Sequence, residues 1–134
     1  MSKSVEGSFI NITDDLETIK RKIAKVPTDS GTTGGSIPET GGLASLFKLC
    51  YLFGGEDLHQ KYVQAYKGKD IRYSEMKSEV SDVIFKELQP IQERRKNYGE
   101  HPEEVDQIIN EGNERARQIA SQTMEEVRGK MGLR

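Results

Sequence analysis

The residues best suited to chemistry in this sequence stand at its start. Ser2, Lys3 and Ser4 place one ammonium group between two hydroxyl groups. A lysine ammonium is a compact positive charge that pairs with phosphate oxygens, and hydroxyl groups add further hydrogen-bond donors. This combination fits contact with a polyphosphate. The four residues that open the chain do not identify a site alone, because an ordinary polar chain start has the same composition.

Other kinds of chemistry find little support. Cys50 lies in the apolar run 46–53, which is typical of a buried small side chain rather than a reactive thiol. His59 and His101 have no second histidine or cysteine at ligand spacing, so we expect no metal site. Neither histidine belongs to a recognisable nucleophile–base pattern. The sequence alone therefore does not indicate a complete enzyme.

Composition limits the classes of protein further. The chain has 134 residues and a formal net charge of −2, which fits one domain and excludes nucleic-acid binding through overall charge. It has no tryptophan and a mean hydropathy of −0.72, so the core must be small. No apolar run reaches membrane-spanning length, and the start lacks the apolar segment of a signal peptide. A single cysteine fits a reducing compartment, and we expect a cytoplasmic location.

The spacing of apolar residues predicts an all-α fold, a bundle of about five helices with an extended N-terminal arm. Asp14 is the expected N-cap of the first helix, with Glu17 in a capping-box position. Gly54-Gly55 should separate the second and third helices, and Pro90 should kink or break the fourth. The predicted helices cover residues 14–26, 43–53, 56–66, 74–98 and 102–131.

Two further segments allow more than one interpretation. The glycine-rich loop 28–42 suggests a phosphate cradle, but it lacks the Gly-Lys-Ser/Thr ending of such loops, so a connecting segment is favoured. The last helix carries an apolar stripe that includes Gly112, Ala116 and Ala120 at every fourth position. Small residues at that spacing let another helix approach closely. We therefore predict that this stripe forms a seam of the core, and that the helices from residue 43 to 131 share it.

Ordered similarities along the chain point to a family. Met1-Ser2-Lys3-Ser4 resembles the signature loop Lys-Met-Ser-Lys-Ser of class I aminoacyl-tRNA synthetases, without its first lysine. From there to its last residues, the chain resembles the part of bacterial-type tryptophanyl-tRNA synthetases that lies C-terminal to this loop. The similar segments include Ile10–Asp15, Ile19–Ile23, Thr28–Ser30, Leu43–Leu46, Tyr66–Gly68, Met76–Val80, Leu88–Arg94, Asn110–Ala120 and Met131–Leu133.

The resemblance implies the C-terminal part of a tryptophan–tRNA ligase, which activates tryptophan with ATP and Mg²⁺ and charges tRNA(Trp). Residues 1–13 would be a signature-loop arm of the catalytic domain, and residues 14–134 a helical anticodon-binding domain. Nothing in the sequence resembles the family's Rossmann-like catalytic domain, so we expect this chain alone to be inactive. The complete family members are homodimers, but much of that contact lies in the missing part, which is compatible with a monomer of this chain.

The resemblance also implies site residues. Lys3 corresponds to the signature lysine that stabilises charge on the pyrophosphate, and Ser2 and Ser4 would assist in binding ATP. Charge and position suggest tRNA contacts for two basic clusters, and we cannot assign anticodon contacts residue by residue. The first cluster is formed by Lys67, Lys69, Arg72 and Lys77 around a turn, and the second by Arg94, Arg95 and Lys96 beside Tyr98. Two alternatives stay open: a stand-alone helical protein-interaction module, and the equivalent piece of a tyrosyl-tRNA synthetase.

Overall fold

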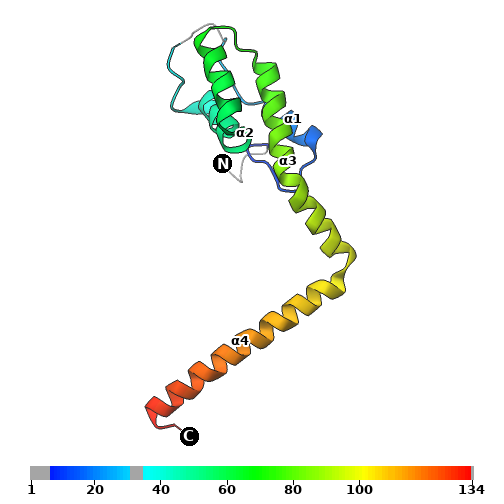
Figure 1. The fold of residues 1–134 in the computed structure, drawn as a ribbon, viewed down its shortest axis with the longest axis vertical. Coiled ribbons are helices and arrows are strands. Elements are labelled where there is room, and N and C mark those ends of the chain that lie inside the picture. Colours follow the sequence, from blue (N-terminus) through cyan, green and yellow to red (C-terminus); the bar gives the residue numbers. More distant parts are fainter. Residues whose placement is uncertain (1–6, 31–34, 134) are drawn as a thin grey trace. The chain divides into compact units, whose positions relative to one another are not determined.

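The computed structural model describes residues 7–30 and 35–133, and within them it is all-α (Figure 1). Its helices are α1 (Leu16–Ala24), α2 (Gly41–Lys67), α3 (Tyr73–Glu100) and α4 (Pro102–Met131). The chain forms two compact units, Met1–Gln92 and Glu93–Arg134. The all-α prediction is confirmed, with four helices in the described residues instead of about five.

The first helix begins later than predicted. The N-cap is Asp15, whose Oδ1 accepts a hydrogen bond from the Thr18 backbone N–H at 2.8 Å. Asp14 therefore does not cap α1, because its carboxylate bonds to Asn11 and Lys22 instead. The helix ends at Ala24, with Lys25 as its C-cap, shortly before Pro27.

The difference between the predicted and observed number of helices arises at Gly55. The two helices predicted on either side of Gly54-Gly55 form one helical element, α2, with a kink at Gly55. The φ of Gly55 is 72° and its ψ is −173°, a combination that is almost restricted to glycine. The predicted break is thus at the right residue, but the chain resumes its helix at once instead of entering a turn.

Pro90 does not end α3. The helix continues from Tyr73 to Glu100 with Pro90 inside it. Proline removes one backbone donor, but the rest of the helix retains its own bonds on both sides. The sequence predicted a kink or a break at Pro90, and the continuous helix excludes the break. The predicted break before Pro102 is confirmed at His101.

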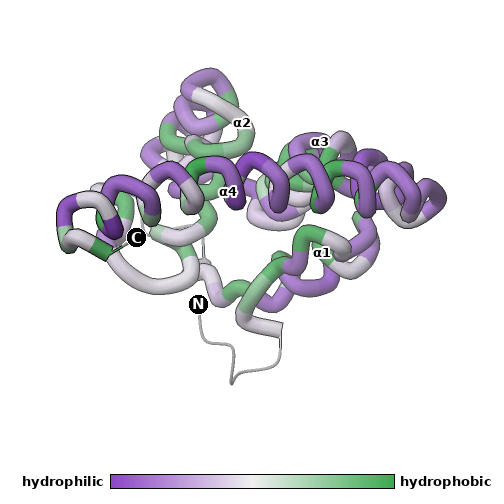
Figure 2. The backbone as a smooth tube through the Cα atoms, turned by 90° about the horizontal axis from the view of Figure 1, so that it is seen from below, coloured by the Kyte–Doolittle hydropathy of each residue, from purple (hydrophilic) through white to green (hydrophobic). Residues whose placement is uncertain are grey.

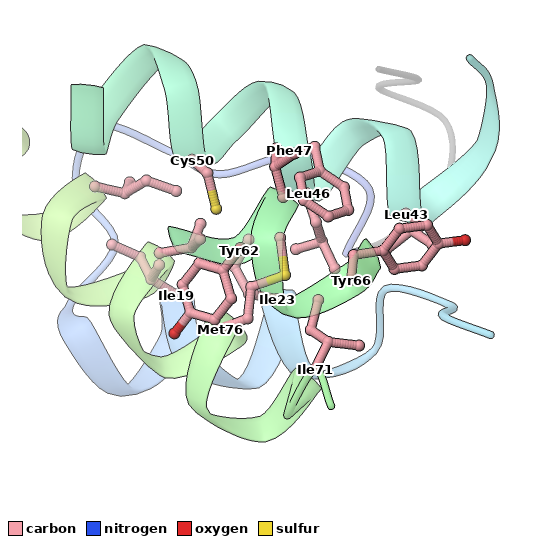
Figure 3. Packing of buried hydrophobic residues seen from close by; sticks show 13 residues of the cluster. Ile19, Ile23, Leu43, Leu46, Phe47, Cys50, Tyr62, Tyr66, Ile71 and Met76 are labelled. Carbon is pink, nitrogen blue, oxygen red and sulfur yellow. The ribbon is translucent and has the colours of Figure 1, made fainter. Parts of the chain in front are cut away.

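The core of the first unit is built from α1, α2 and the first half of α3 (Figure 3). Ile19, Leu46, Cys50, Met76 and Val80 are completely buried. Burial raises the pKa of the Cys50 thiol to about 12, aided by the negative charge of Glu79, which agrees with the predicted role as a small apolar side chain. The other buried members of the cluster are Ile23, Leu43, Phe47, Tyr62, Val63, Tyr66, Ile71 and Ile84.

The helix α4 of the second unit buries none of its residues. It carries both hydrophobic and hydrophilic residues along its length (Figure 2). Ile108 is 55% exposed and Ile119 is 61% exposed, so the predicted core seam along this helix is wrong. Apolar residues at helical spacing indicate that one face of a helix can pack against another surface. They do not show that this surface belongs to the same chain. Among the residues that the structure describes, no helix has the length and apolar character needed to cross a membrane.

Candidate functional site

The residues expected to meet a polyphosphate, Ser2, Lys3 and Ser4, lie outside the described residues. The structure begins at Gly7 and shows the segment that connects them to α1. This segment, residues 7–15, has no regular secondary structure, and it is called the arm below. The structure therefore informs the candidate site through the geometry of residues 7–15.

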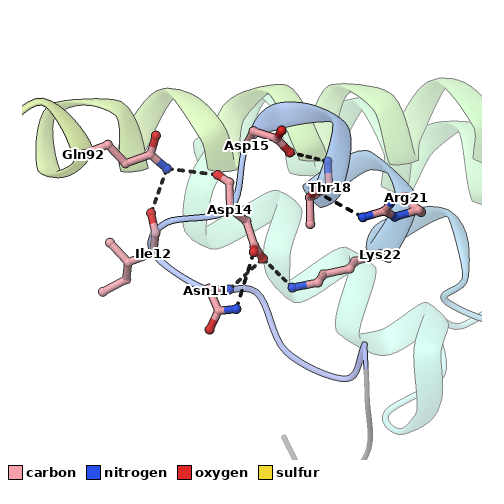
Figure 4. A network of polar contacts seen from close by, with 8 residues as sticks. All are labelled: Asn11, Ile12, Asp14, Asp15, Thr18, Arg21, Lys22 and Gln92. Carbon is pink, nitrogen blue, oxygen red and sulfur yellow. Dashed lines mark hydrogen bonds and ion pairs between the residues drawn. The ribbon is translucent and has the colours of Figure 1, made fainter. Parts of the chain in front are cut away.

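A turn at Asn11–Asp14 closes the arm (Figure 4). The Asp14 N–H donates to the Asn11 carbonyl at 3.1 Å, and the Asn11 N–H donates to Asp14 Oδ2 at 2.8 Å. Lys22 of α1 reaches the same carboxylate oxygen with its Nζ at 2.5 Å. Its ammonium also lies 5.3 Å from the centre of the Phe9 ring, a cation–π contact. The arm is thus fastened to α1 at two points.

The arm is also fastened to α3, through Gln92. The Gln92 Nε2 donates to the carbonyl of Ile12 at 2.7 Å and to the carbonyl of Asp14 at 3.0 Å (Figure 4). A primary amide nitrogen has two hydrogens, so these two bonds use all of its donor capacity. Residues that are far apart in the sequence thereby fix the backbone on both sides of Thr13.

The electrostatics of the turn favour a charged Asp14. Burial by itself raises the pKa of this carboxyl group, but the hydrogen bonds from Lys22 and Asn11 and the charge of Lys22 outweigh it, so the net pKa is lowered. The Asp14 side chain is only 10% exposed and Lys22 is 18% exposed. Since both charges are mostly withdrawn from water, removing either one would leave the other buried without a partner, which is destabilising.

An apolar cavity of about 450 Å³ lies beside the arm within the first unit. Its lining includes Phe9, Ile10 and Ile12 of the arm, together with apolar residues of α2 and α3 (Leu49, Phe53 and Leu88). Apolar walls of this kind suit hydrophobic contact and offer little to phosphate groups. The cavity therefore fits packing of the arm against the helices rather than binding of a nucleotide.

The glycine-rich loop is anchored at Asp29. The hydroxyl of Tyr66 donates to Asp29 Oδ2 at 3.1 Å, and the hydroxyl of Tyr73 donates to Asp29 Oδ1. Burial, and then the hydrogen bond and charge of Asp29, raise the pKa of Tyr73. Residues 31–34 of the loop lie outside the described residues. The anchor supports the favoured interpretation of a connecting segment that is attached to α2 and α3.

The first basic cluster begins at Lys67, the last residue of α2. Lys67, Lys69 and Arg72 are all exposed, and Lys69 has a left-handed φ of 60° in the turn. Arg72 pairs with Glu75 at 3.0 Å. Lys77 does not belong to this cluster, because its Nζ donates to the carbonyls of Ala24 and Val26 at 2.9 and 2.7 Å, at the end of α1. The sequence position of Lys77 suggested a place in the cluster, but its ammonium binds carbonyl groups at the C-terminal end of a helix, where positive charge is favourable.

The second basic cluster lies on α3 in the second unit. Arg94, Arg95, Lys96 and Tyr98 are exposed, and Tyr98 is 43% exposed. Arg94 and Arg95 precede Tyr98 by four and three residues, so they share a side of the helix with its ring. Lys96 lies 3.7 Å from Glu100. The structure thus brings two cations and one aromatic ring to the same helix side.

Two contacts that position these elements were not predicted from the sequence. One is Gln92, whose type and place in an amphipathic helix give no signal of a bond to the arm. The other is the pair of tyrosines on Asp29, which only the folded chain brings together. In the described part of the chain, no three histidine, cysteine, aspartate or glutamate side chains gather as a metal site would require.

Comparison with a family model gives a match to the class I tRNA synthetases for tryptophan and tyrosine over residues 1–89. Curated relatives match nearly the whole chain. A tryptophan–tRNA ligase of Porphyromonas gingivalis is 31% identical over 134 residues, which is 100% of this chain and 41% of that protein. Those of Caldanaerobacter subterraneus subsp. tengcongensis and Enterococcus faecalis are 35% and 34% identical, over 99% of this chain and 40% and 39% of their own lengths.

This chain therefore spans about two fifths of the length of the curated relatives that it matches. No solved structure matches it.

Proposed function

This chain belongs to the class I tRNA synthetases for tryptophan and tyrosine, and we propose that it acts as part of a tryptophan–tRNA ligase. In that role it would supply the ATP-facing signature segment and a helical part that contacts tRNA(Trp), in the cytoplasm. The complete ligase would activate tryptophan with ATP and Mg²⁺ and transfer it to the tRNA. The observation that carries the proposal is the match of tryptophan–tRNA ligases along almost the whole chain.

The same match bears on the alternatives. A stand-alone helical interaction module would not be expected to follow these ligases from one end to the other. A tyrosine-specific enzyme fits the family model, which includes both amino acids, but the similar proteins of Porphyromonas gingivalis and Caldanaerobacter subterraneus are named for tryptophan. Tryptophan is therefore the proposed substrate, and the choice between the two amino acids is a matter for assay.

In the proposed reaction, Lys3 stabilises the negative charge that develops on the pyrophosphate as the adenylate forms. Ser2 and Ser4 donate hydrogen bonds to the ATP phosphates. Loss of one preorganised donor of this kind typically reduces the rate by about 10²–10³-fold. Lysine can act here as a point charge, whereas arginine would need a different geometry.

The tRNA contacts are proposed from charge and exposure. Lys67, Lys69 and Arg72 would pair with backbone phosphates, which contribute affinity but little sequence discrimination. On α3, Arg94, Arg95 and Lys96 would do the same. Tyr98 would stack on an unpaired base, since recognition of single-stranded RNA relies on such aromatic rings.

The activity test uses the polypeptide of the complete reading frame that contains this chain. We expect tryptophan-dependent exchange of pyrophosphate into ATP, reduced about 10²–10³-fold by Lys3→Ala. Lys25→Ala, an exposed lysine in the described part, serves as the matched control. Exchange that depends on tyrosine would replace the proposed substrate, and exchange with neither amino acid would refute the ligase activity.

The tRNA test compares two triple variants of equal charge change in the same polypeptide. One replaces Arg94, Arg95 and Lys96 with alanine, and the other replaces Arg115, Arg117 and Lys130 on α4. We expect the first to weaken binding of tRNA(Trp) at low salt and to reduce the salt dependence of binding. Equal affinity for the two variants would exclude the α3 cluster as a tRNA contact.

A further inference from the structure

One face of α4 carries apolar and small side chains with nothing packed on them. The helix has 30 residues, is about 45 Å long and buries none of its residues. This surface, called the α4 face below, includes Ile108, Ile109, Ile119 and Val127, whose exposed fractions lie between 39% and 61%. A Cβ built at Gly112 would meet open space. Since helices gain most of their stability from packing an amphipathic face, the α4 face is suited to a partner surface.

The two halves of α4 carry opposite charge. Residues 102–114 contain five carboxylates and no cation, a net charge of −5, whereas residues 115–131 contain four cations and two carboxylates, a net charge of +2. The helix dipole favours such an order only in the terminal turns. Glu111, Glu114, Arg115 and Arg117 lie in the middle of α4, so the dipole does not account for them. A complementary partner has the reverse order of charge, and a second α4 in antiparallel direction has this order.

Small residues in the middle of α4 favour the same arrangement. Gly112, Ala116 and Ala120 recur at every fourth position, and the distance between two packed helices depends on the side chains at their contact. If two antiparallel copies cross at this point, Ala116 of each copy faces Ala120 of the other. In this register Val105 faces Met131 of the second copy. The acidic half of each helix then lies along the basic half of the other, whereas a parallel pair would bring the two acidic halves together.

We propose that the α4 face is an interaction surface for a second copy of this chain, and that two α4 helices pair through it in antiparallel direction. Such an interface is two-fold symmetric, so each residue contributes to it twice. Both α4 faces are covered in the dimer, so association ends at two copies. The pairing uses residues of α4 alone and does not depend on the proposed ligase activity.

The first measurement is sedimentation equilibrium of the 134-residue chain. We expect a concentration-dependent dimer with about twice the 15.1 kDa mass of one chain. Ile119→Gln should raise the dimer dissociation constant by about 10²–10⁴-fold, because two isoleucines lose their burial. Ser121→Gln is the matched control, since it puts the same side chain on the opposite side of α4 and should match the wild type. Neither residue belongs to the core of the first unit, so circular dichroism should show its unfolding unchanged in both variants.

Three results of this measurement would overturn the proposal. A chain that stays monomeric up to its solubility limit does not pair through α4. Assembly beyond the dimer excludes a closed antiparallel pair, which leaves no free α4 face. A dimer with the same dissociation constant for Ile119→Gln and Ser121→Gln has its contact elsewhere.

The second measurement determines the direction of pairing by thiol cross-linking. Val105→Cys and Met131→Cys place single new thiols near opposite ends of α4, about 39 Å apart along the helix, and the native Cys50 is completely buried. In an equimolar mixture, a short thiol-directed cross-linker should join one variant to the other, as identified by mass. Each variant alone should stay uncrosslinked. Cross-links between two copies of the same variant would show parallel pairing and overturn the antiparallel arrangement.

Discussion

The anchor of the glycine-rich loop gives the most direct test of how the first unit is held together. Replacing Tyr66 with phenylalanine removes the hydroxyl that donates to Asp29 at 3.1 Å and leaves the ring in the core. That ring is 3% exposed and packs edge-to-face on Phe47 with 5.7 Å between the centroids. Packing should therefore be retained, and the change isolates one hydrogen bond to a carboxylate. Tyr73→Phe removes the second hydroxyl in the same way.

The size of the effect follows from the charge of the acceptor. Hydrogen bonds to charged groups stabilise proteins by about 1.5–3 kcal/mol. We take about 1.5 kcal/mol for each tyrosine, because the site is only partly buried and the remaining hydroxyl still contacts Asp29. For a unit of this size, 1 kcal/mol shifts Tm by about 4–8 °C, so each single variant should lose roughly 6–12 °C.

The assay is thermal unfolding of the 134-residue chain by circular dichroism, with Tyr51→Phe as the control. Tyr51 is 54% exposed, so its hydroxyl should contribute little. The pKa of Tyr73 is raised in the folded state, so the stability that it provides is present below the unfolded pKa, about 10, and is lost as pH rises above it. Tyr73→Phe should weaken this alkaline loss. Tm losses of Tyr66→Phe and Tyr73→Phe no larger than that of Tyr51→Phe would refute the anchor.

Four other outcomes are expected. Because the pKa of Asp14 is lowered in the folded state, its charged carboxylate stabilises the fold above the unfolded pKa of about 4. The free energy of unfolding should therefore fall as the pH drops below about 4. In urea titrations, Lys22→Met should reduce this acid dependence. Gly55→Ala should destabilise by about 1–3 kcal/mol from backbone strain alone, since its new Cβ meets open space, whereas Gly129→Ala in α4 should not lower Tm. Cys50, with its pKa at about 12, should react with a thiol reagent at about pH 8 only after unfolding. The 134-residue chain alone should not catalyse tryptophan-dependent pyrophosphate exchange, and detectable exchange would contradict this expectation.

Local sequence signals predicted most of the helices. Apolar spacing placed α1 and α3 closely, and Pro102 with the preceding histidine marked the start of α4. The errors in helix boundaries arose where the same residues are compatible with more than one local conformation. Asp14 and Asp15 can each cap a helix, and the choice depended on Lys22, eight residues beyond Asp14. At Gly55, a glycine pair is compatible with either a turn or a kink.

The candidate site was less predictable, for a physical reason. The charge of Lys77 suggested membership of a basic cluster, but the ammonium binds two carbonyls at the end of α1, a contact between residues about fifty positions apart. The bonds of Gln92 to the arm span an even longer separation. Such long-range polar contacts depend on the relative placement of whole helices, which hydrophobic periodicity does not determine. The roles of Lys3 and of the exposed cations stay predictions, as does the division into residues 1–13 and 14–134.

The uncovered apolar face of α4 has a consequence for the life of this chain in a cell. The exposed apolar residues of α4 include Ile108, Ile109, Ile119 and Met131. Molecular chaperones and quality-control proteases bind exposed apolar surface of this kind. A newly made copy would therefore be retained or degraded according to how soon that face is shielded. Its abundance would then depend on the shielding as well as on the stability of the first unit.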